Sequence, residues 1–118
     1  MKINNSELKF MEIIWENEPV SSGDAVKLSS EILGWKKSTV YTVIKKLCEK
    51  NILESENAIL VSKVSKETIL EKESKEIVNE KFSASLPMFL ASFMKNEKIS
   101  PEEAEELKEL IDRYTREG

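Results

Sequence analysis

The sequence predicts a mostly α-helical protein with one small β-hairpin, and with helices both before and after the hairpin. Three observations support this prediction. Apolar residues recur at helical spacing in three successive N-terminal segments. A short segment follows, with turn-forming residues in its middle and β-branched residues towards its end. After residue 66 the pattern is helical again, but the segment is much more highly charged.

The first helix is expected from about Ser6 to Asn17, with Ser6 as its N-cap. The Glu18-Pro19 pair should end the helix, because the residue before a proline avoids the α region. One apolar stripe is expected to be buried and consists of Leu8, Met11, Ile14 and Trp15.

The second helix is expected to be capped within the run from Ser21 to Asp24 and to stop at Gly34, a residue suited to a helix C-terminus. Its apolar residues are Ala25, Val26, Leu28, Ile32 and Leu33. Trp35 fills the connection to a third helix that ends near Asn51.

The third helix carries the most informative pattern in the chain. Its buried stripe is Val40, Val43, Ile44 and Leu47, at positions i, i+3, i+4 and i+7. The other face carries Lys37, Ser38, Tyr41, Thr42, Lys45 and Lys46, and no acid interrupts it before Glu49. Lysine suits phosphate and short hydroxyls can reach base edges, so this face suits a nucleic-acid groove. The alternative is an ordinary amphipathic surface helix.

The segment Ile52–Val64 predicts two short antiparallel strands with a tight turn around Asn57. Three helices followed by a hairpin is the order of a winged helix-turn-helix, in which the third helix enters the major groove. The sequence therefore predicts that fold for residues 1–66.

Charge is distributed unevenly along the chain. Residues 1–66 hold ten Lys and nine Asp or Glu, a net charge of +1, whereas residues 67–118 hold eight Lys or Arg and thirteen acids, a net charge of −5. The lysines cluster locally at Lys36, Lys37, Lys45, Lys46 and Lys50. Local positive potential, rather than the total of −4, attracts a polyanion.

The composition argues against an enzyme. The chain contains no histidine and a single cysteine, Cys48, which excludes histidine-dependent triads, the common zinc sites and an internal disulfide. Three scattered glycines form no phosphate-binding loop, so we expect neither a metal nor a cofactor. Cys48 is expected to be a partly buried filler. No apolar run reaches membrane-spanning length and no signal peptide is visible, which predicts a cytoplasmic protein without membrane insertion.

Residues 67–118 are expected to form a helical dimerisation region. A charged helix is expected from Lys66 to about Lys81, an apolar patch from Leu86 to Met94, and a last helix that opens at Ser100-Pro101. These segments are too small to build a core of their own, and a second copy of the chain is the simplest partner. The alternative is that they fold back on the first domain and keep it monomeric.

Several of these segments resemble the penicillinase-repressor family, of the BlaI and MecI type. They are Leu8–Trp15, Val20–Ser22, Trp35 with Ser38–Thr42, Lys46-Leu47, Phe89–Glu97 and Glu103–Ile111, which span nearly the whole chain in the family's order. The resemblance implies a homodimeric winged-helix repressor that covers a palindromic operator of β-lactam-resistance genes.

The resemblance also implies roles for individual residues. The DNA-binding residues would be Lys36, Lys37, Ser38, Thr39, Tyr41, Thr42, Lys45 and Lys46. The dimerisation residues would be Ile77, Leu86, Phe89, Leu90, Phe93, Leu107, Leu110, Ile111 and Tyr114. Relief of repression would follow cleavage between Ser92 and Phe93 by a sensor-linked protease. A related repressor type senses copper through C-terminal cysteines, which this chain lacks.

Alternatives remain for single residues and for the protein. Tyr41 could simply pack against Lys45, and Thr39 could cap the third helix. The hairpin carries Glu54 and Glu56 where basic residues are expected, so only Asn57 or Lys63 could contact phosphate there. For the whole protein, the alternatives are a protein-interaction adaptor on a winged-helix scaffold and a repressor of the same family with another inducing signal.

Overall fold

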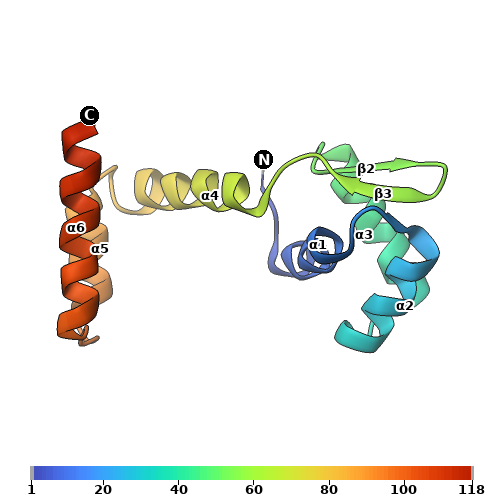
Figure 1. Ribbon diagram of the computed structural model, residues 1–118, viewed down its shortest axis with the longest axis horizontal. Coiled ribbons are helices and arrows are strands. Elements are labelled where there is room, and N and C mark those ends of the chain that lie inside the picture. The colour runs from blue at the N-terminus through green and yellow to red at the C-terminus, as the bar shows by residue number, and fades with distance from the viewer. Residues whose placement is uncertain (1, 118) are drawn as a thin grey trace. The chain divides into compact units, whose positions relative to one another are not determined.

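The computed structural model describes residues 2–117, and within them the chain forms six helices and three short strands (Figure 1). The elements are α1 (Asn5–Asn17), β1 (Val20–Ser21), α2 (Ser22–Leu33), α3 (Lys37–Glu49), β2 (Leu53–Glu56), β3 (Ile59–Ser62), α4 (Lys66–Lys81), α5 (Leu86–Met94) and α6 (Pro101–Glu117). The predicted mostly helical fold with a small antiparallel sheet is confirmed.

The chain divides into two compact units, Met1–Glu76 and Ile77–Gly118, and the division falls inside α4. We call them the N-terminal unit and the C-terminal unit. The assignment of DNA binding to residues 1–66 and of dimerisation to residues 67–118 stays a prediction.

The start of α1 differs from the prediction. Asn4, and not Ser6, is the N-cap: its side chain accepts a 2.8 Å hydrogen bond from the Glu7 N–H, and the Glu7 carboxylate accepts a 2.9 Å bond from the Asn4 N–H. This reciprocal capping box requires an acid or amide three residues after the cap. Asn4 has Glu7 at that position, whereas Ser6 has Lys9.

The ends of α2 agree with the prediction, and the start of α3 excludes one of the alternative roles considered for Thr39. Ser21 caps α2 by accepting the Asp24 N–H at 3.0 Å, and Gly34 ends it at φ +69°, a left-handed conformation that glycine adopts without strain. The N-cap of α3 is Lys36, which makes no side-chain capping bond. Thr39 therefore does not cap α3, because the helix already begins at Lys37.

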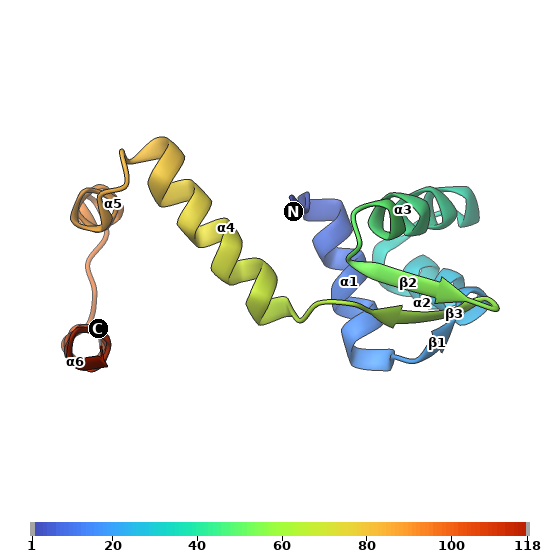
Figure 2. The same ribbon diagram turned by 90° about the horizontal axis from the view of Figure 1, so that it is seen from above.

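The sheet has the order β1-β3-β2, with all neighbours antiparallel (Figure 2). The predicted turn between β2 and β3 consists of Asn57 and Ala58, which both have positive φ, +52° and +61°. Two successive positive φ values are the mark of the type I′ turn that suits two-residue hairpins. The sequence did not predict β1, because a two-residue strand shows no periodicity.

One apolar core holds the N-terminal unit together. It combines Phe10, Met11 and Ile14 of α1, Val20, Ala25 of α2, Val40, Val43, Ile44 and Leu47 of α3, Ile52, Leu53 and Leu60 around the hairpin, and Ile69 of α4. The predicted stripe of α3 is buried as expected. In α1 the prediction was partly wrong: Leu8 and Trp15 are only half-buried, while Phe10 and Ile13 are buried.

The C-terminal unit contains the end of α4 together with α5 and α6. The rings of Phe82 and Phe89 pack edge to face, with centroids 5.2 Å apart. Ser85 caps α5 by accepting the Met88 N–H at 3.1 Å, and Ser100 caps α6 by accepting the Glu103 N–H at 3.1 Å. From residue 77 to residue 116, no side chain is buried.

Candidate nucleic-acid interface

The outer face of α3 is exposed to solvent in the structure. The four apolar residues of its stripe point into the core. The predicted DNA-binding residues, which are Lys36, Lys37, Ser38, Thr39, Tyr41, Thr42, Lys45 and Lys46, are all exposed. The structure thus brings them together on one helix and the residue before it. We call this set the α3 face.

The charge of the α3 face is not neutralised by neighbouring acids. Within the described residues, Lys36, Lys37, Lys45 and Lys46 form no ion pair with a carboxylate. The Lys37 ammonium instead lies 5.9 Å from the centre of the Tyr41 ring. Tyr41 was expected to pack on Lys45 if its role was structural, but the nearby cation comes from the turn before it. The free ammonium groups leave this surface positive.

Two hydroxyls of the α3 face differ in what they can offer a ligand. The Thr42 hydroxyl donates a 3.0 Å hydrogen bond to the Ser38 carbonyl oxygen, one helical turn earlier. This bond uses its only proton, so Thr42 can present its lone pairs as an acceptor. The Thr39 hydroxyl is exposed on the same helix. A base amino group is a suitable donor to Thr42.

A shallow groove of about 440 Å³ runs between the α3 face and the start of α1. Its lining residues are Asn4, Ser6, Trp35, Ser38, Thr39, Thr42, Val43 and Lys46. The sequence did not single out Asn4 and Ser6 for this region, because only the tertiary fold brings the first turn of α1 beside α3. Trp35 supports the groove from below, where its ring stacks on Phe10 at 6.1 Å.

Lys50 belongs to the basic cluster in the sequence, but its ammonium group is paired with an acid. Its ammonium lies 2.7 Å from Oε1 of Glu7, and the Glu7 side chain is only 2% exposed. The same oxygen accepts the Asn4 N–H, and the other carboxylate oxygen, Oε2, has no protein partner. This ion pair joins the C-terminal end of α3 to the first turn of α1 and therefore holds the α3 face in place.

The hairpin has little positive charge. Glu54 and Glu56 are exposed and pair across the strands with Val61 and Ile59. Asn57 at the turn and Lys63 beyond β3 are exposed. On the β1 side, the Glu18 carboxylate accepts bonds of 2.8 Å from both the Ser62 N–H and the Ser62 hydroxyl. This contact fixes the hairpin to the end of α1.

Cys48 is half-buried beside the core, as predicted. Burial raises the pKa of its thiol, and the nearby Lys63 lowers it by a smaller amount. A raised pKa leaves less thiolate at neutral pH, so this cysteine is a poor nucleophile. Among residues 2–117 no cluster of histidine, cysteine or acidic side chains could hold a metal ion. None of the helices in that range combines the length and the apolar character needed to cross a bilayer.

The predicted dimerisation residues all lie in the C-terminal unit. Ile77, Leu86, Phe93, Leu110, Ile111 and Tyr114 are exposed, while Phe89, Leu90 and Leu107 are half-buried. The predicted cleavage residues Ser92 and Phe93 are both exposed and lie within the helix α5.

The family model of the penicillinase repressors matches residues 3–113 of this chain. Similar proteins include the penicillinase repressor of Bacillus licheniformis, which is 22% identical over 117 residues, or 96% of this chain and 91% of that protein. The methicillin resistance regulatory protein MecI of Staphylococcus aureus strain Mu50 is 26% identical over 116 residues, or 95% of this chain and 94% of the relative.

The fold is also similar to a solved structure. This is the solution structure of the monomeric form of Bacillus licheniformis BlaI in complex with the blaP half-operator. The TM-score is 0.50 and the sequence identity is 21%, over 56% of this chain and 85% of that chain. The predicted winged-helix fold is confirmed. The predictions of a DNA-binding repressor rather than an enzyme are confirmed as well, because this chain belongs to the penicillinase repressor family.

Proposed function

We propose that this repressor binds a palindromic operator as a homodimer, with α3 of each protomer in the major groove of one half-site. The observation that carries the proposal is the α3 face, whose lysines are exposed and pair with no carboxylate of the residues that the structure describes. Unpaired ammonium groups beside exposed hydroxyls are the chemistry that binds a phosphate backbone and reads base edges. In winged-helix proteins the helix in this position enters the groove.

The residues of the α3 face divide into two roles in this proposal. Lys36, Lys37, Lys45 and Lys46 neutralise phosphates. Ser38, Thr39, Tyr41 and Thr42 approach bases and the phosphates next to them. The hairpin contributes little, because Glu54 and Glu56 repel a phosphate backbone, and its contacts are limited to Asn57 or Lys63.

Dimerisation occurs through the C-terminal unit. Its exposed apolar residues are Ile77 at the end of α4, Leu86 and Phe93 on α5, and Leu110, Ile111 and Tyr114 on α6. Phe89, Leu90 and Leu107 are half-buried beside them. Burying such faces against a second copy is favourable by about 25 cal/mol for each Å² of apolar area. Two linked α3 helices then bind a palindrome far more tightly than one alone.

Repression would be relieved by cleavage between Ser92 and Phe93 by a sensor-linked protease in the cytoplasm, and the regulated genes would confer β-lactam resistance. The family name and the position of both residues on exposed α5 support this part of the proposal. Cleavage there would separate Phe93, Met94 and all of α6 from the rest of the chain. Since both residues are helical, the protease must unwind α5 before it can cut.

The proposal is tested with Lys46→Ala and Thr42→Ala in titrations of duplex DNA at several salt concentrations. Lys46→Ala should weaken binding to specific and unrelated duplexes alike and reduce the slope of log affinity against log salt by about 1. Thr42→Ala should leave the slope unchanged but reduce discrimination at one base pair by about tenfold.

Lys72→Ala is the matched control, because it removes an exposed lysine from α4 and leaves the α3 face intact. It should bind like the wild type. Equal losses for Lys46→Ala and Lys72→Ala, or wild-type binding that ignored both salt and sequence, would rule the proposed interface out.

A further inference from the structure

The connection between the hairpin and α4 is short and contains no glycine. Only Lys63, Val64 and Ser65 separate the end of β3 from the start of α4. The connection therefore lacks the residue with the widest range of backbone conformations, and side-chain contacts can restrict it further.

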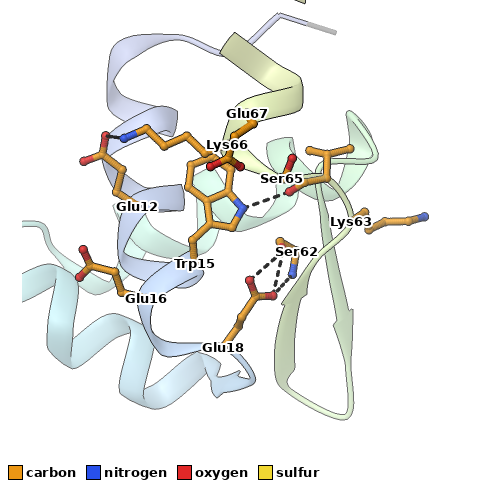
Figure 3. A pocket seen from close by; sticks show the side chains of 10 residues that line it. Glu12, Trp15, Glu16, Glu18, Ser62, Lys63, Ser65, Lys66 and Glu67 are labelled. Atoms are coloured by element: carbon orange, nitrogen blue, oxygen red, sulfur yellow. Dashed lines mark hydrogen bonds and ion pairs between the residues drawn. The ribbon is translucent and has the colours of Figure 1, made fainter. Parts of the chain in front are cut away.

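Trp15 of α1 holds the centre of this connection. Its indole Nε1–H donates a 3.0 Å hydrogen bond to the Val64 carbonyl oxygen. Figure 3 draws the Trp15 side chain, with a dashed line from the nitrogen of its ring. The next residue, Ser65, begins α4 by accepting the Thr68 N–H at 3.1 Å. Ser65, which caps α4, therefore directly follows Val64, which Trp15 of α1 holds by a hydrogen bond.

Two further contacts tie the first turns of α4 to α1 and to the apolar core. The Lys66 ammonium lies 3.3 Å from Oε1 of Glu12, which belongs to α1 (Figure 3). Ile69 is 1% exposed and is part of the main core. Residues 64, 66 and 69 are therefore anchored by a hydrogen bond, an ion pair and apolar packing. We call this arrangement the α4 joint.

One side of the α4 joint is open to solvent. A hollow of about 600 Å³ lies there, lined by Glu12, Trp15, Glu16, Glu18, Ser62, Lys63, Val64, Ser65, Lys66 and Glu67. Trp15, Val64, Glu12 and Lys66 all line this hollow, so the indole hydrogen bond and the Lys66–Glu12 ion pair both lie at its wall. The hollow lies away from the α3 face and shares no lining residue with the groove there.

We infer that Trp15 is a positioning residue that restricts the spacing of the two operator half-sites that the repressor accepts. By fixing the direction of α4 relative to α1 and the hairpin, the α4 joint limits the distances at which two copies of α3 can bind at once. This inference rests on the proposed homodimeric repressor. In such dimers the half-site spacing follows from the protein geometry. A loose joint would let the dimer adapt to other spacings.

The test uses the full chain and three variants, Trp15→Phe, Lys66→Gln and Lys75→Gln. Trp15→Phe removes the indole donor but keeps an aromatic ring. Lys66→Gln removes the ion pair to Glu12. Lys75→Gln is the matched control: it removes the same charge from α4 but only disrupts the 3.0 Å pair with Glu71 within that helix.

The probes are duplexes carrying the half-site that the wild-type protein selects from random DNA. One duplex holds a single half-site, and the others hold inverted repeats whose spacing changes in single base-pair steps. For the wild type, affinity should fall about tenfold when the spacing departs from the optimum by about two base pairs. For Trp15→Phe this fall should shrink to about threefold or less, with single half-site affinity unchanged to within about twofold. Lys66→Gln should show the same trend more weakly, and Lys75→Gln should match the wild type.

Hydrogen exchange gives an independent measure of the joint. The Ile69 amide, which donates to the Ser65 carbonyl at 3.3 Å, should exchange faster in Trp15→Phe, while amides of α3 should not. An unchanged spacing profile in a folded Trp15→Phe protein would overturn the inference. If Trp15→Phe does not fold, the comparison of Lys66→Gln with Lys75→Gln tests the inference instead. Identical spacing profiles for these two variants would overturn the inference as well. Failure of the wild type to prefer an inverted repeat would instead contradict the proposed function.

Discussion

The two units of this chain both contain amphipathic helices, but only the N-terminal unit buries their apolar faces. In the N-terminal unit, α1 and α3 turn their apolar stripes towards each other and the hairpin, and residues such as Phe10 and Leu47 are fully buried. In the C-terminal unit, α6 has an apolar stripe of similar spacing, yet Ile111 remains 57% exposed. Spacing therefore makes a helix amphipathic, but it does not provide the surface that covers the apolar face.

The two units also leave different chemistry exposed. The α3 face offers lysines and hydroxyls, whereas α5 and α6 offer Phe93, Leu110 and Tyr114. Exposed cations gain most from a polyanion, because binding releases its counterions. Exposed apolar side chains gain most from another apolar surface. Under the proposed function, each unit therefore has a partner of its own kind, and one unit can be damaged without the other.

The largest expected effect follows from placing a charge on the apolar face of α6. Ile111→Glu should abolish dimerisation at micromolar concentration, because a carboxylate cannot be buried without a partner. Affinity for an inverted repeat should fall about a hundredfold, while affinity for a single half-site stays the same. Analytical ultracentrifugation and titration of both duplexes measure these effects.

Ile111→Leu is the control, since it keeps the face apolar and should behave like the wild type. Thermal unfolding of the N-terminal unit should be equal in both variants. If Ile111→Glu lowered the stability of that unit, the two units would not be independent in the way the comparison requires.

A smaller effect is expected from the buried ion pair of the N-terminal unit. Lys50→Met should lower the free energy of unfolding by about 2 kcal/mol, because it leaves the Glu7 carboxylate buried without its counter-charge. The Lys50 side chain is 36% exposed, which keeps the loss below that of a fully buried pair. Urea unfolding followed by tryptophan fluorescence measures the change.

Lys75→Met is the comparison for this variant, because the Lys75–Glu71 pair is exposed and should contribute less than about 0.5 kcal/mol. Dimerisation through the C-terminal unit should not change in either protein. A loss as large for Lys75→Met as for Lys50→Met would show that burial of Glu7 is not the cause.

The smallest effect concerns residues with positive φ in each unit. Ala58 in the hairpin turn has φ +61° and Ala84 between α4 and α5 has φ +60°. Glycine adopts this conformation without the steric cost that alanine meets. Ala58→Gly should therefore raise the free energy of unfolding of the N-terminal unit by about 0.5 kcal/mol.

Ala84→Gly relieves the same strain outside the N-terminal unit, so it should leave the urea midpoint of that unit unchanged. A gain of equal size from both substitutions would mean that the two units unfold together. That result would contradict the contrast drawn between them.

Local patterns in the sequence were sufficient for much of the fold and for most of the α3 face. The spacing of Val40, Val43, Ile44 and Leu47 decides which side of α3 is buried, and hence that Lys45 and Lys46 are exposed. Gly34 and Asn57 mark a helix end and a hairpin turn through their own backbone preferences. The capping box of Asn4 and Glu7 is just as local, and applying the three-residue spacing would have placed the start of α1 correctly.

Only the tertiary structure decided which distant residues meet. Lys50 pairs with Glu7 across 43 residues, and Trp15 holds Val64 across 49 residues. No periodicity links such positions, because their contact depends on how whole helices pack around the core. For the same reason the sequence placed Lys50 in the basic cluster without showing its pairing with Glu7, and it did not identify Asn4 and Ser6 as groove residues or the α4 joint. Local sequence patterns thus determined the helices and strands and the side of each helix that is apolar. Tertiary packing determined which distant residues hold the α3 face and α4 in place.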